Sequence, residues 1–186
     1  MTFFTRKGDK GKTGLFGCDQ RISKSSAVAE ALGSLDEVNS FLGLCKIQSK
    51  ASNFYINTEH PSFEYVVHEL QEMLFIVQAE LAGADKKVSA EKVAWVEEIV
   101  RAIEEELPPI TTFFISGGAE LAATFDVART IARRAERRVV EVDEEGEKRL
   151  GEHTLAFMNR LSSILYALAR LSNHKSGIKE DAPDYQ

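Results

Sequence analysis

The sequence predicts an all-α fold, an up-and-down five-helix bundle preceded by a glycine-rich N-terminal arm. Apolar residues recur at helical spacing in five long segments, and turn-rich stretches separate these segments. The β-prone stretches are short and isolated, which disfavours a sheet of any size. The 186 residues, 44% of them hydrophobic, are enough for one core. We therefore expect a single domain over residues 1–186, with an arm at 1–24 and a tail at 174–186.

The first two helices are predicted from their apolar stripes. Ser25 and Ser26 are both N-cap candidates for the first helix, which is expected to end near Ser49. Its apolar positions are Val28, Leu32, Leu35, Val38, Leu42 and Cys45. After a polar stretch at 49–62, the second helix would stop at Gly83. Its apolar positions are Phe63, Val66, Leu70, Leu74, Val77 and Leu81.

Three further helices are predicted in the second half of the chain. Their expected bounds are about Ser89 to the Pro108-Pro109 pair, Leu121 to about Val142, and from the acidic turn DEEGE (143–147) to the tail. The buried side of the last helix would carry Leu150, Thr154, Phe157, Leu161, Leu165, Leu168 and Leu171. Between the third and fourth helices, TTFFIS (111–116) is β-prone but isolated, so no sheet is predicted there.

The arm contains KGDKGKTG (7–14), which looks at first like a phosphate-binding P-loop. A Walker A loop needs a glycine five positions before the glycine of Gly-Lys-Thr, and Arg6 stands there. The residues before it are also too few for a buried strand. Residues 1–24 still carry six basic side chains against two acidic ones, a balance of +4 in a chain of net charge −6. A basic, glycine-rich arm on an acidic body indicates a small anionic ligand.

Composition and residue spacing also argue against several kinds of partner: nucleic acid, a membrane and a protein-bound metal. A net charge of −6 argues against general nucleic-acid binding, and no apolar run is long enough to span a membrane. Cys18 and Cys45 have no CxxC spacing, so we interpret them as idle thiols of a cytoplasmic protein. The four histidines lack metal-ligand spacing, and no protein-bound metal is predicted.

The fourth helix is rich in arginine, and one of its stripes contains Arg129, Arg133 and Glu136. Arginines four residues apart repel each other, so the stripe suits either an anion or a salt-bridged surface. On the first helix, Asp36 lies in a stripe of small residues that also contains Gly33, Ser40 and Gly43. That stripe is either a helix-packing groove or a place where a ligand or another subunit approaches. In both cases we expect Asp36 near the fourth helix.

Two other features allow a structural and a functional interpretation. The last helix places Asn159, Ser163, Tyr166 and Arg170 on one polar stripe, which is typical of a solvent-facing surface but could bind a ligand. Phe113, ahead of a glycine pair, is either a core plug or a ligand wall.

Taken together, the motifs resemble the PduO-type ATP:cob(I)alamin adenosyltransferases. The matching stretches are TRKGDKGKTGLFG (5–17), ALGSLDEVNSFLG (31–43), FFISGG (113–118), ARTIARRAERRVV (128–140) and FMNRLSSILYALAR (157–170). The resemblance implies a homotrimer with active sites between subunits. It implies ATP, Mg²⁺ held mainly by the ATP phosphates, and cobalamin as the second substrate. A reductase and a cobalamin-dependent acceptor enzyme are implied as partners.

By the same resemblance, particular residues acquire roles. Those matching ATP-binding positions are Thr5, Arg6, Gly8, Asp9, Lys10, Gly11, Thr13, Lys24, Glu136, Arg137 and Asn159. Arg133 matches a position that reaches the reacting region, and Phe113 matches the aromatic residue that closes the lower face of the corrin. Asp36 and Arg129 match an intersubunit salt bridge beside the corrinoid.

The implied reaction is attack of cob(I)alamin on C5′ of ATP, which forms adenosylcobalamin and releases triphosphate. Two departures concern the corrinoid pocket: Ser116 replaces a proline common in relatives, and segment 51–62 is longer than expected. Two other functions stay open. The arm could bind ATP as a regulatory signal on a non-catalytic bundle, or the chain could be a purely structural oligomer.

Overall fold

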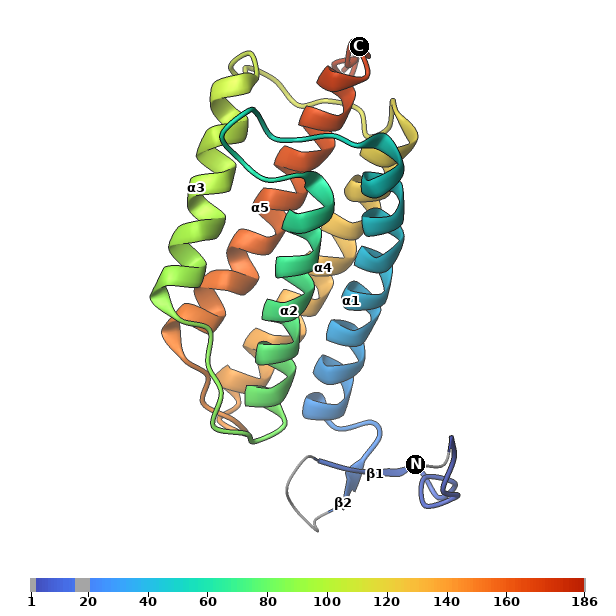
Figure 1. Ribbon diagram of the computed structural model, residues 1–186. Coiled ribbons are helices and arrows are strands. Elements are labelled where there is room, and N and C mark those ends of the chain that lie inside the picture. The colour runs from blue at the N-terminus through green and yellow to red at the C-terminus, as the bar shows by residue number, and fades with distance from the viewer. Residues whose placement is uncertain (1–2, 16–20, 186) are drawn as a thin grey trace.

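The computed structural model of the protein describes residues 3–15 and 21–185, so Cys18 lies outside the described residues. Five helices run alternately up and down along one bundle (Figure 1). They are α1 (Ala27–Ser52), α2 (Phe63–Leu81), α3 (Ala90–Glu106), α4 (Glu120–Glu144) and α5 (Glu152–Lys175). The predicted five-helix fold is confirmed.

Two of the predicted N-caps are confirmed. The Ser26 hydroxyl accepts a hydrogen bond from the Ala29 amide at 3.4 Å, and Ser89 caps α3 in the same way through Lys92. The end of α1 near Ser49 was predicted too early, because the helix continues to Ser52 and ends at Asn53 in the left-handed conformation (φ 53°). Asn tolerates that conformation better than most residues. Leu150 lies just before α5 rather than inside it.

The core forms where the five apolar stripes meet. α1 packs between α2 and α4, and α5 packs between α4 and α3. Phe63, Phe125 and Phe157 are fully buried, and the rings of Phe63 and Phe125 meet edge to face at 6.3 Å between centroids. Truncating one such ring to alanine costs about 3–5 kcal/mol in typical cores. The three buried rings are therefore central to the stability of the bundle.

Two helices receive their N-terminal caps from distant side chains. Ala119 and Gly151, at the N-cap positions of α4 and α5, supply no side-chain cap. Instead the Ala119 amide donates to Asn173 Oδ1 at 2.8 Å, and the Gly151 amide donates to Glu80 Oε1 at 2.8 Å. Both capping side chains are only 2% exposed. These bonds fasten the start of each helix to another helix.

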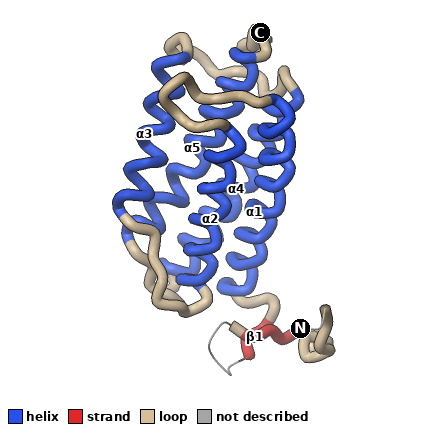
Figure 2. Tube along the Cα trace, in the orientation of Figure 1, coloured by secondary structure: helices blue, strands red, loops and turns tan. Residues whose placement is uncertain are grey.

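The N-terminal arm contains a small hairpin that the sequence did not predict. Strands β1 (Lys12–Gly14) and β2 (Arg21–Ser23) pair antiparallel, with Thr13 opposite Ile22. The hairpin projects from the end of the bundle where α1 begins (Figure 2). TTFFIS forms no strand, as predicted.

The segment predicted as a tail, residues 174–186, contacts the rest of the chain. α5 continues to Lys175, and the following segment folds back onto the loop before α4. The Ile178 amide donates to the Asn173 carbonyl, and the Ile115 amide donates to the Asp181 carbonyl, both at 2.9 Å. A tail without an apolar period is thus held by polar contacts.

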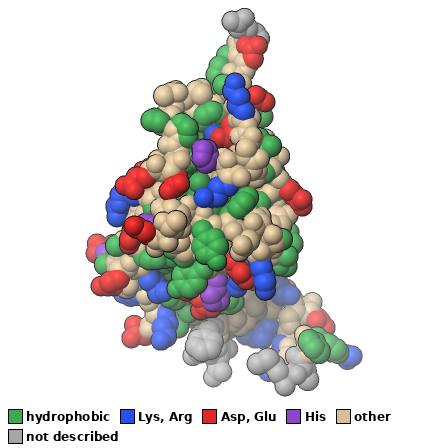
Figure 3. Space-filling view, turned by 45° about the horizontal axis from the view of Figure 1, so that its top comes forward, with side chains coloured by type: hydrophobic (Ala, Val, Ile, Leu, Met, Phe, Trp, Pro, Cys, Tyr) green, Lys and Arg blue, Asp and Glu red, His purple; other side chains and the backbone are tan. Residues whose placement is uncertain are grey.

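Burial raises the pKa of the Cys45 thiol to about 12, which keeps it protonated at neutral pH and agrees with an idle thiol. On the face seen in Figure 3, hydrophobic side chains reach the surface among charged ones. None of the helices in residues 3–15 and 21–185 has the length and apolarity required to cross a membrane.

Candidate functional site

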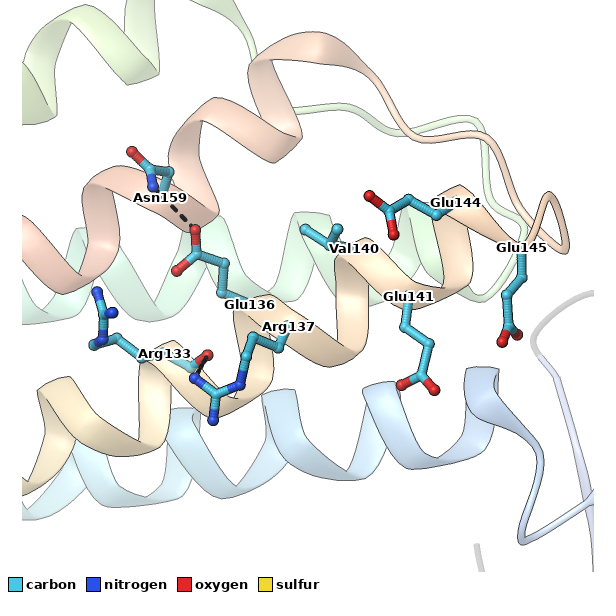
Figure 4. Close-up of a pocket in the computed structure, with 8 residues that line it drawn as sticks. All are labelled: Arg133, Glu136, Arg137, Val140, Glu141, Glu144, Glu145 and Asn159. Carbon is cyan, nitrogen blue, oxygen red and sulfur yellow. Dashed lines mark hydrogen bonds between the residues drawn. The ribbon is translucent and has the colours of Figure 1, made fainter.

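A charged pocket of about 630 Å³ lies along α4, facing the first turns of α5 (Figure 4). Its lining residues are Arg133, Glu136, Arg137, Val140, Glu141, Glu144, Glu145 and Asn159. Asn159 Nδ2 donates to Glu136 Oε1 at 3.0 Å, and Arg137 Nη1 donates to the backbone carbonyl of Arg133 at 3.0 Å. Four residues predicted to contact ATP or the reacting region therefore line one pocket.

A second, aromatic pocket of about 740 Å³ lies next to it on the same two helices. Its lining residues are Ile110, Thr111, Thr112, Phe113, Phe114, Ser116, Arg129, Arg133, Ser162, Ser163 and Tyr166. Phe113 is 78% exposed, so the core-plug interpretation was wrong for this residue. Phe114 instead packs inward, where its ring centroid lies 3.8 Å from the Arg170 guanidinium carbon. An exposed ring beside an apolar hollow suits a flat, largely apolar ligand.

Arg133 lines both pockets. Its side chain is exposed on α4, one turn from Arg129 on one side and near Glu136 on the other. The predicted stripe of two guanidinium groups and a carboxylate is thus present, and it runs from the aromatic pocket into the charged one. The Arg133 guanidinium group, where the two pockets meet, can therefore contact a ligand in either pocket.

Arg129 lies deeper than Arg133, with 27% of its side chain exposed. Its Nε atom is 3.6 Å from Asp126 Oδ1 but makes no hydrogen bond with the described residues. Its guanidinium carbon is 5.9 Å from the centroid of the Tyr166 ring. Arg129 Nε is therefore a buried donor without a hydrogen-bond partner among the described residues.

Asp36 does not meet Arg129 within one chain. Asp36 is exposed on α1, while Arg129 pairs with Asp126 on its own helix. The expected closeness of this part of α1 to α4 is seen one residue later, where Glu37 Oε2 lies 2.5 Å from Arg134 Nη2. Within one chain the described residues show no ion pair between Asp36 and Arg129.

The predicted arm residues gather around the hairpin. Arg21 Nη2 donates to the carbonyls of Lys7 and Lys12, both at 2.7 Å, and the Lys24 amide donates to the Gly11 carbonyl at 2.9 Å. A Cβ on Gly8 would lie 3.2 Å from Lys24 Nζ, so the small residue lets this ammonium approach the backbone. Gly11 has a φ of 73°, which favours glycine.

Most of these arm side chains face solvent. Thr5, Arg6, Asp9, Lys10, Gly11 and Lys24 are exposed, whereas Gly8 and Thr13 are partly buried. The hydrogen bonds given above stay within the arm, and the arm extends beyond the end of the bundle (Figure 1). One chain therefore presents the arm residues and the charged pocket as two separate groups.

The polar stripe on α5 is only partly solvent-facing. Asn159 and Ser163 are exposed, but Arg170 is 7% exposed. Burial lowers the pKa of the Arg170 guanidinium, against the opposing effects of Tyr166 and Asp126. The sequence placed Arg170 on a polar stripe but did not predict its burial, and it did not single out Asn173 or Glu180. No local signal marks these residues, because their partners come from distant segments.

The two departures from the family pattern lie in different places. Ser116 lines the aromatic pocket, and segment 51–62 does not. In that segment Ile56 is fully buried, and Asn53, Phe54, Tyr55, Asn57 and Thr58 line a separate hollow with Glu106 and Lys175. Among the residues that the structure describes, no group of three or more metal-ligating side chains gathers.

Fold and site together define a helical-bundle protein with two adjoining ligand pockets, one charged and one aromatic, and a basic arm. The family model of cobalamin adenosyltransferases matches residues 3–172. The chain belongs to the cobalamin adenosyltransferase family.

Relatives and solved structures agree with this membership. The corrinoid adenosyltransferase of Bacillus subtilis is 38% identical over 185 residues, covering 96% of this chain and 90% of that protein. The corrinoid adenosyltransferase PduO of Citrobacter freundii is also 38% identical, but this chain spans only 50% of its length. A variant of the PduO-type ATP:corrinoid adenosyltransferase from Lactobacillus reuteri, complexed with cobalamin and ATP, superposes with a TM-score of 0.84. The two sequences are 30% identical, and the superposition covers 98% of this chain and 99% of the Lactobacillus reuteri chain.

Proposed function

We propose that this protein transfers the 5′-deoxyadenosyl group of ATP to cob(I)alamin, forming adenosylcobalamin and releasing triphosphate. One observation carries the proposal: the charged and aromatic pockets adjoin each other and share Arg133. The transfer requires a polyanion and a flat corrin to meet at a single bond-forming position. A pair of pockets joined by a guanidinium group supplies that arrangement.

In this proposal the nucleotide occupies the charged pocket. Glu136, Arg137 and Asn159 contact ATP there. The arm residues Thr5, Arg6, Gly8, Asp9, Lys10, Gly11, Thr13 and Lys24 wrap the triphosphate. Backbone amides of a glycine-rich turn and lysine ammonium groups stabilise phosphate through hydrogen bonds and charge.

The corrinoid occupies the aromatic pocket, where Phe113 closes the lower face of the corrin. Exclusion of the lower axial ligand makes cobalt easier to reduce, and the resulting cob(I)alamin is a strong nucleophile. Its cobalt donates an electron pair to C5′ of ATP, so the Co–C bond forms as the C5′–O bond breaks. Triphosphate leaves with the electrons of that bond. No side chain acts as a nucleophile, and Arg133 stabilises the charge that develops on the leaving group.

Mg²⁺ fits the charged pocket as a companion of the triphosphate. Phosphate-bound Mg²⁺ usually needs only one or two carboxylates from the protein, and Glu136, Glu141, Glu144 and Glu145 line this pocket. Asp9 of the arm is a further carboxylate in the proposed triphosphate site. When bound, the ion would neutralise part of the triphosphate charge.

The proposed assembly is a homotrimer with its sites between chains. Three observations support an interface on α1 and the adjacent α2. Asp36 is exposed while Arg129 pairs with Asp126 in its own chain, a Cβ on Gly33 would meet nothing within 4 Å, and Leu44, Ile47 and Phe75 are more than half exposed. A second chain placed there would bring its arm or its Arg129 to Asp36.

The remaining parts of the proposal concern the protein in the cell. We propose one domain with an ATP-binding arm, located in the cytoplasm, where a thiol such as Cys45 stays reduced. A reductase supplies the electron for cob(I)alamin, and a cobalamin-dependent enzyme accepts the product.

The test is the visible spectrum of the purified protein with ATP, Mg²⁺ and chemically reduced cobalamin. We expect the cob(I)alamin band to decay as a light-sensitive alkylcobalamin spectrum grows. ATP binding without any spectral change would contradict the transferase and support a regulatory ATP-binding bundle. If the protein does not bind ATP at all, the remaining interpretation is a purely structural oligomer.

A further inference from the structure

The loop that carries Phe113 has no regular secondary structure, yet its backbone is fastened at four points. The Ile115 amide donates to the Asp181 carbonyl at 2.9 Å, and the Gly117 amide donates to Asp126 Oδ2 at 3.2 Å. Asn173 Nδ2 donates to the Gly117 carbonyl at 2.9 Å, and the Ala119 amide donates to Asn173 Oδ1 at 2.8 Å. Asn173 and Asp181, which supply three of these four bonds, both follow the family motif that ends at Arg170.

Asn173 is the centre of this network. Besides its two bonds to the loop, its Nδ2 donates to Glu180 Oε1 at 2.8 Å. The side chain is only 2% exposed, so a lost partner would leave a buried amide unsatisfied. A Cβ on Gly118 (φ 100°) would lie 2.4 Å from Asn173 Oδ1, so the loop passes Asn173 as closely as a glycine allows.

Glu180 connects the network to the aromatic pocket. Its other carboxylate oxygen, Oε2, pairs with Arg170 Nη2, and the two side chains are 15% and 8% exposed. The same Arg170 guanidinium lies against the Phe114 ring. Phe114 and Ile110 separate the aromatic pocket from a smaller hollow of about 250 Å³, which Arg170, Ile178 and Glu180 line from the far side. The chain Glu180, Arg170, Phe114 thus supports the wall of the pocket from behind.

We infer that the C-terminal segment 178–181, acting through Asn173 and Arg170, positions the 112–118 loop so that Phe113 forms the wall of the aromatic pocket. Glu180 is a positioning residue, since it touches Asn173 and Arg170 but does not line that pocket. The network lies on the aromatic side only, so it should affect corrinoid use and leave ATP binding alone. This inference rests on the proposed function for its kinetic part.

The test compares Glu180→Ala with the matched control Asp181→Ala. Asp181 contacts the loop through its backbone carbonyl, which alanine retains, whereas Glu180 contacts the network through its side chain. Hydrogen exchange of the 112–118 peptide in the ligand-free protein reports loop position without any need for activity. We expect exchange at Ile115 to become about tenfold faster in Glu180→Ala and to change less than twofold in Asp181→Ala.

Kinetics provide the second readout. We expect Glu180→Ala to raise the corrinoid KM about tenfold while the ATP KM changes less than twofold. Glu180→Gln keeps the side-chain length and the contact with Asn173 but loses the charge facing Arg170, so it should give an intermediate defect and serves if the alanine variant does not fold. Unchanged hydrogen exchange at Ile115, or an equal rise in the corrinoid KM and the ATP KM, would overturn the inference. A wild-type protein that makes no adenosylcobalamin would contradict the proposed function, while the exchange result would still decide whether the segment holds the loop.

Discussion

The N-terminal arm and the 112–118 loop both lie outside the helices and both carry proposed ligand contacts, but they are held in different ways. The arm is held by its own hairpin, by Arg21 and by Leu15 and Ile22, which pack partly buried against the core, while most of its proposed ATP-binding side chains are exposed. The loop is held by side chains that are almost fully buried, Arg170 and Asn173. The aromatic pocket is therefore built by contacts within one chain, whereas the proposed phosphate site needs the arm to meet a charged pocket that none of the described arm residues lines. Binding energy from ATP can complete the second site but is not needed for the first.

The largest effect is expected at Arg133, where the two pockets join. Arg133→Ala should lower kcat about 100-fold or more, because one preorganised charge aimed at the leaving group is typically worth that much. The oligomer should stay intact, as judged by sedimentation. Arg138→Ala is the matched control, since Arg138 is on the same helix but pairs with Glu141 and Glu30 and lines neither pocket. Full activity of Arg133→Ala would remove this residue from the mechanism.

The arm should respond to nucleotide more than the loop does. Hydrogen exchange of the described arm residues 3–15 is expected to slow about tenfold on addition of ATP and Mg²⁺, because their amides gain phosphate partners. The Ile115 amide, which is already bonded to Asp181, should change little. Equal protection of both regions before ATP is added would contradict the comparison.

A smaller and selective effect is expected at Asp36. Asp36→Ala should raise the corrinoid KM about fivefold and leave the ATP KM within twofold, because its proposed partner Arg129 lines the aromatic pocket. Glu37→Ala is the adjacent control, since Glu37 already pairs with Arg134 in an exposed contact of the kind usually worth about 1 kcal/mol or less. Steady-state kinetics with each substrate varied in turn separates the two KM values. An unchanged corrinoid KM would count against a cleft between chains.

The smallest effect tests the interface itself. Gly33→Ala should favour helix α1 by up to about 1 kcal/mol, since the added methyl group meets nothing within 4 Å in its own chain. If another chain packs on this stripe, the same methyl group should weaken self-association. Sedimentation equilibrium measures association, and Lys50→Ala, at an exposed position later on the same helix, provides the control. A variant that is more stable and equally associated would place the interface elsewhere.

Sequence by itself determined the features that depend on neighbours three or four residues apart. The five helices, the caps at Ser26 and Ser89 and the arginine stripe of α4 all follow from local spacing, because a helix repeats its environment every 3.6 residues. Local spacing placed Arg133 and Glu136 on one stripe of α4, but Asn159 on α5 was grouped with them only by the family resemblance, and the structure brings all three to one pocket. The roles assigned to the arm and to Asp36 still come from resemblance.

Only the tertiary structure decided the contacts between segments that are distant in the chain. Asn173 caps α4 from 54 residues away, and Glu80 caps α5 from 71 residues away. Arg170 is buried because Phe114 and Glu180 cover it, although its position on α5 indicated a polar surface. Such pairs leave no periodic signal, since each depends on where two separate segments meet after packing and on the cost of leaving a buried polar group without a partner.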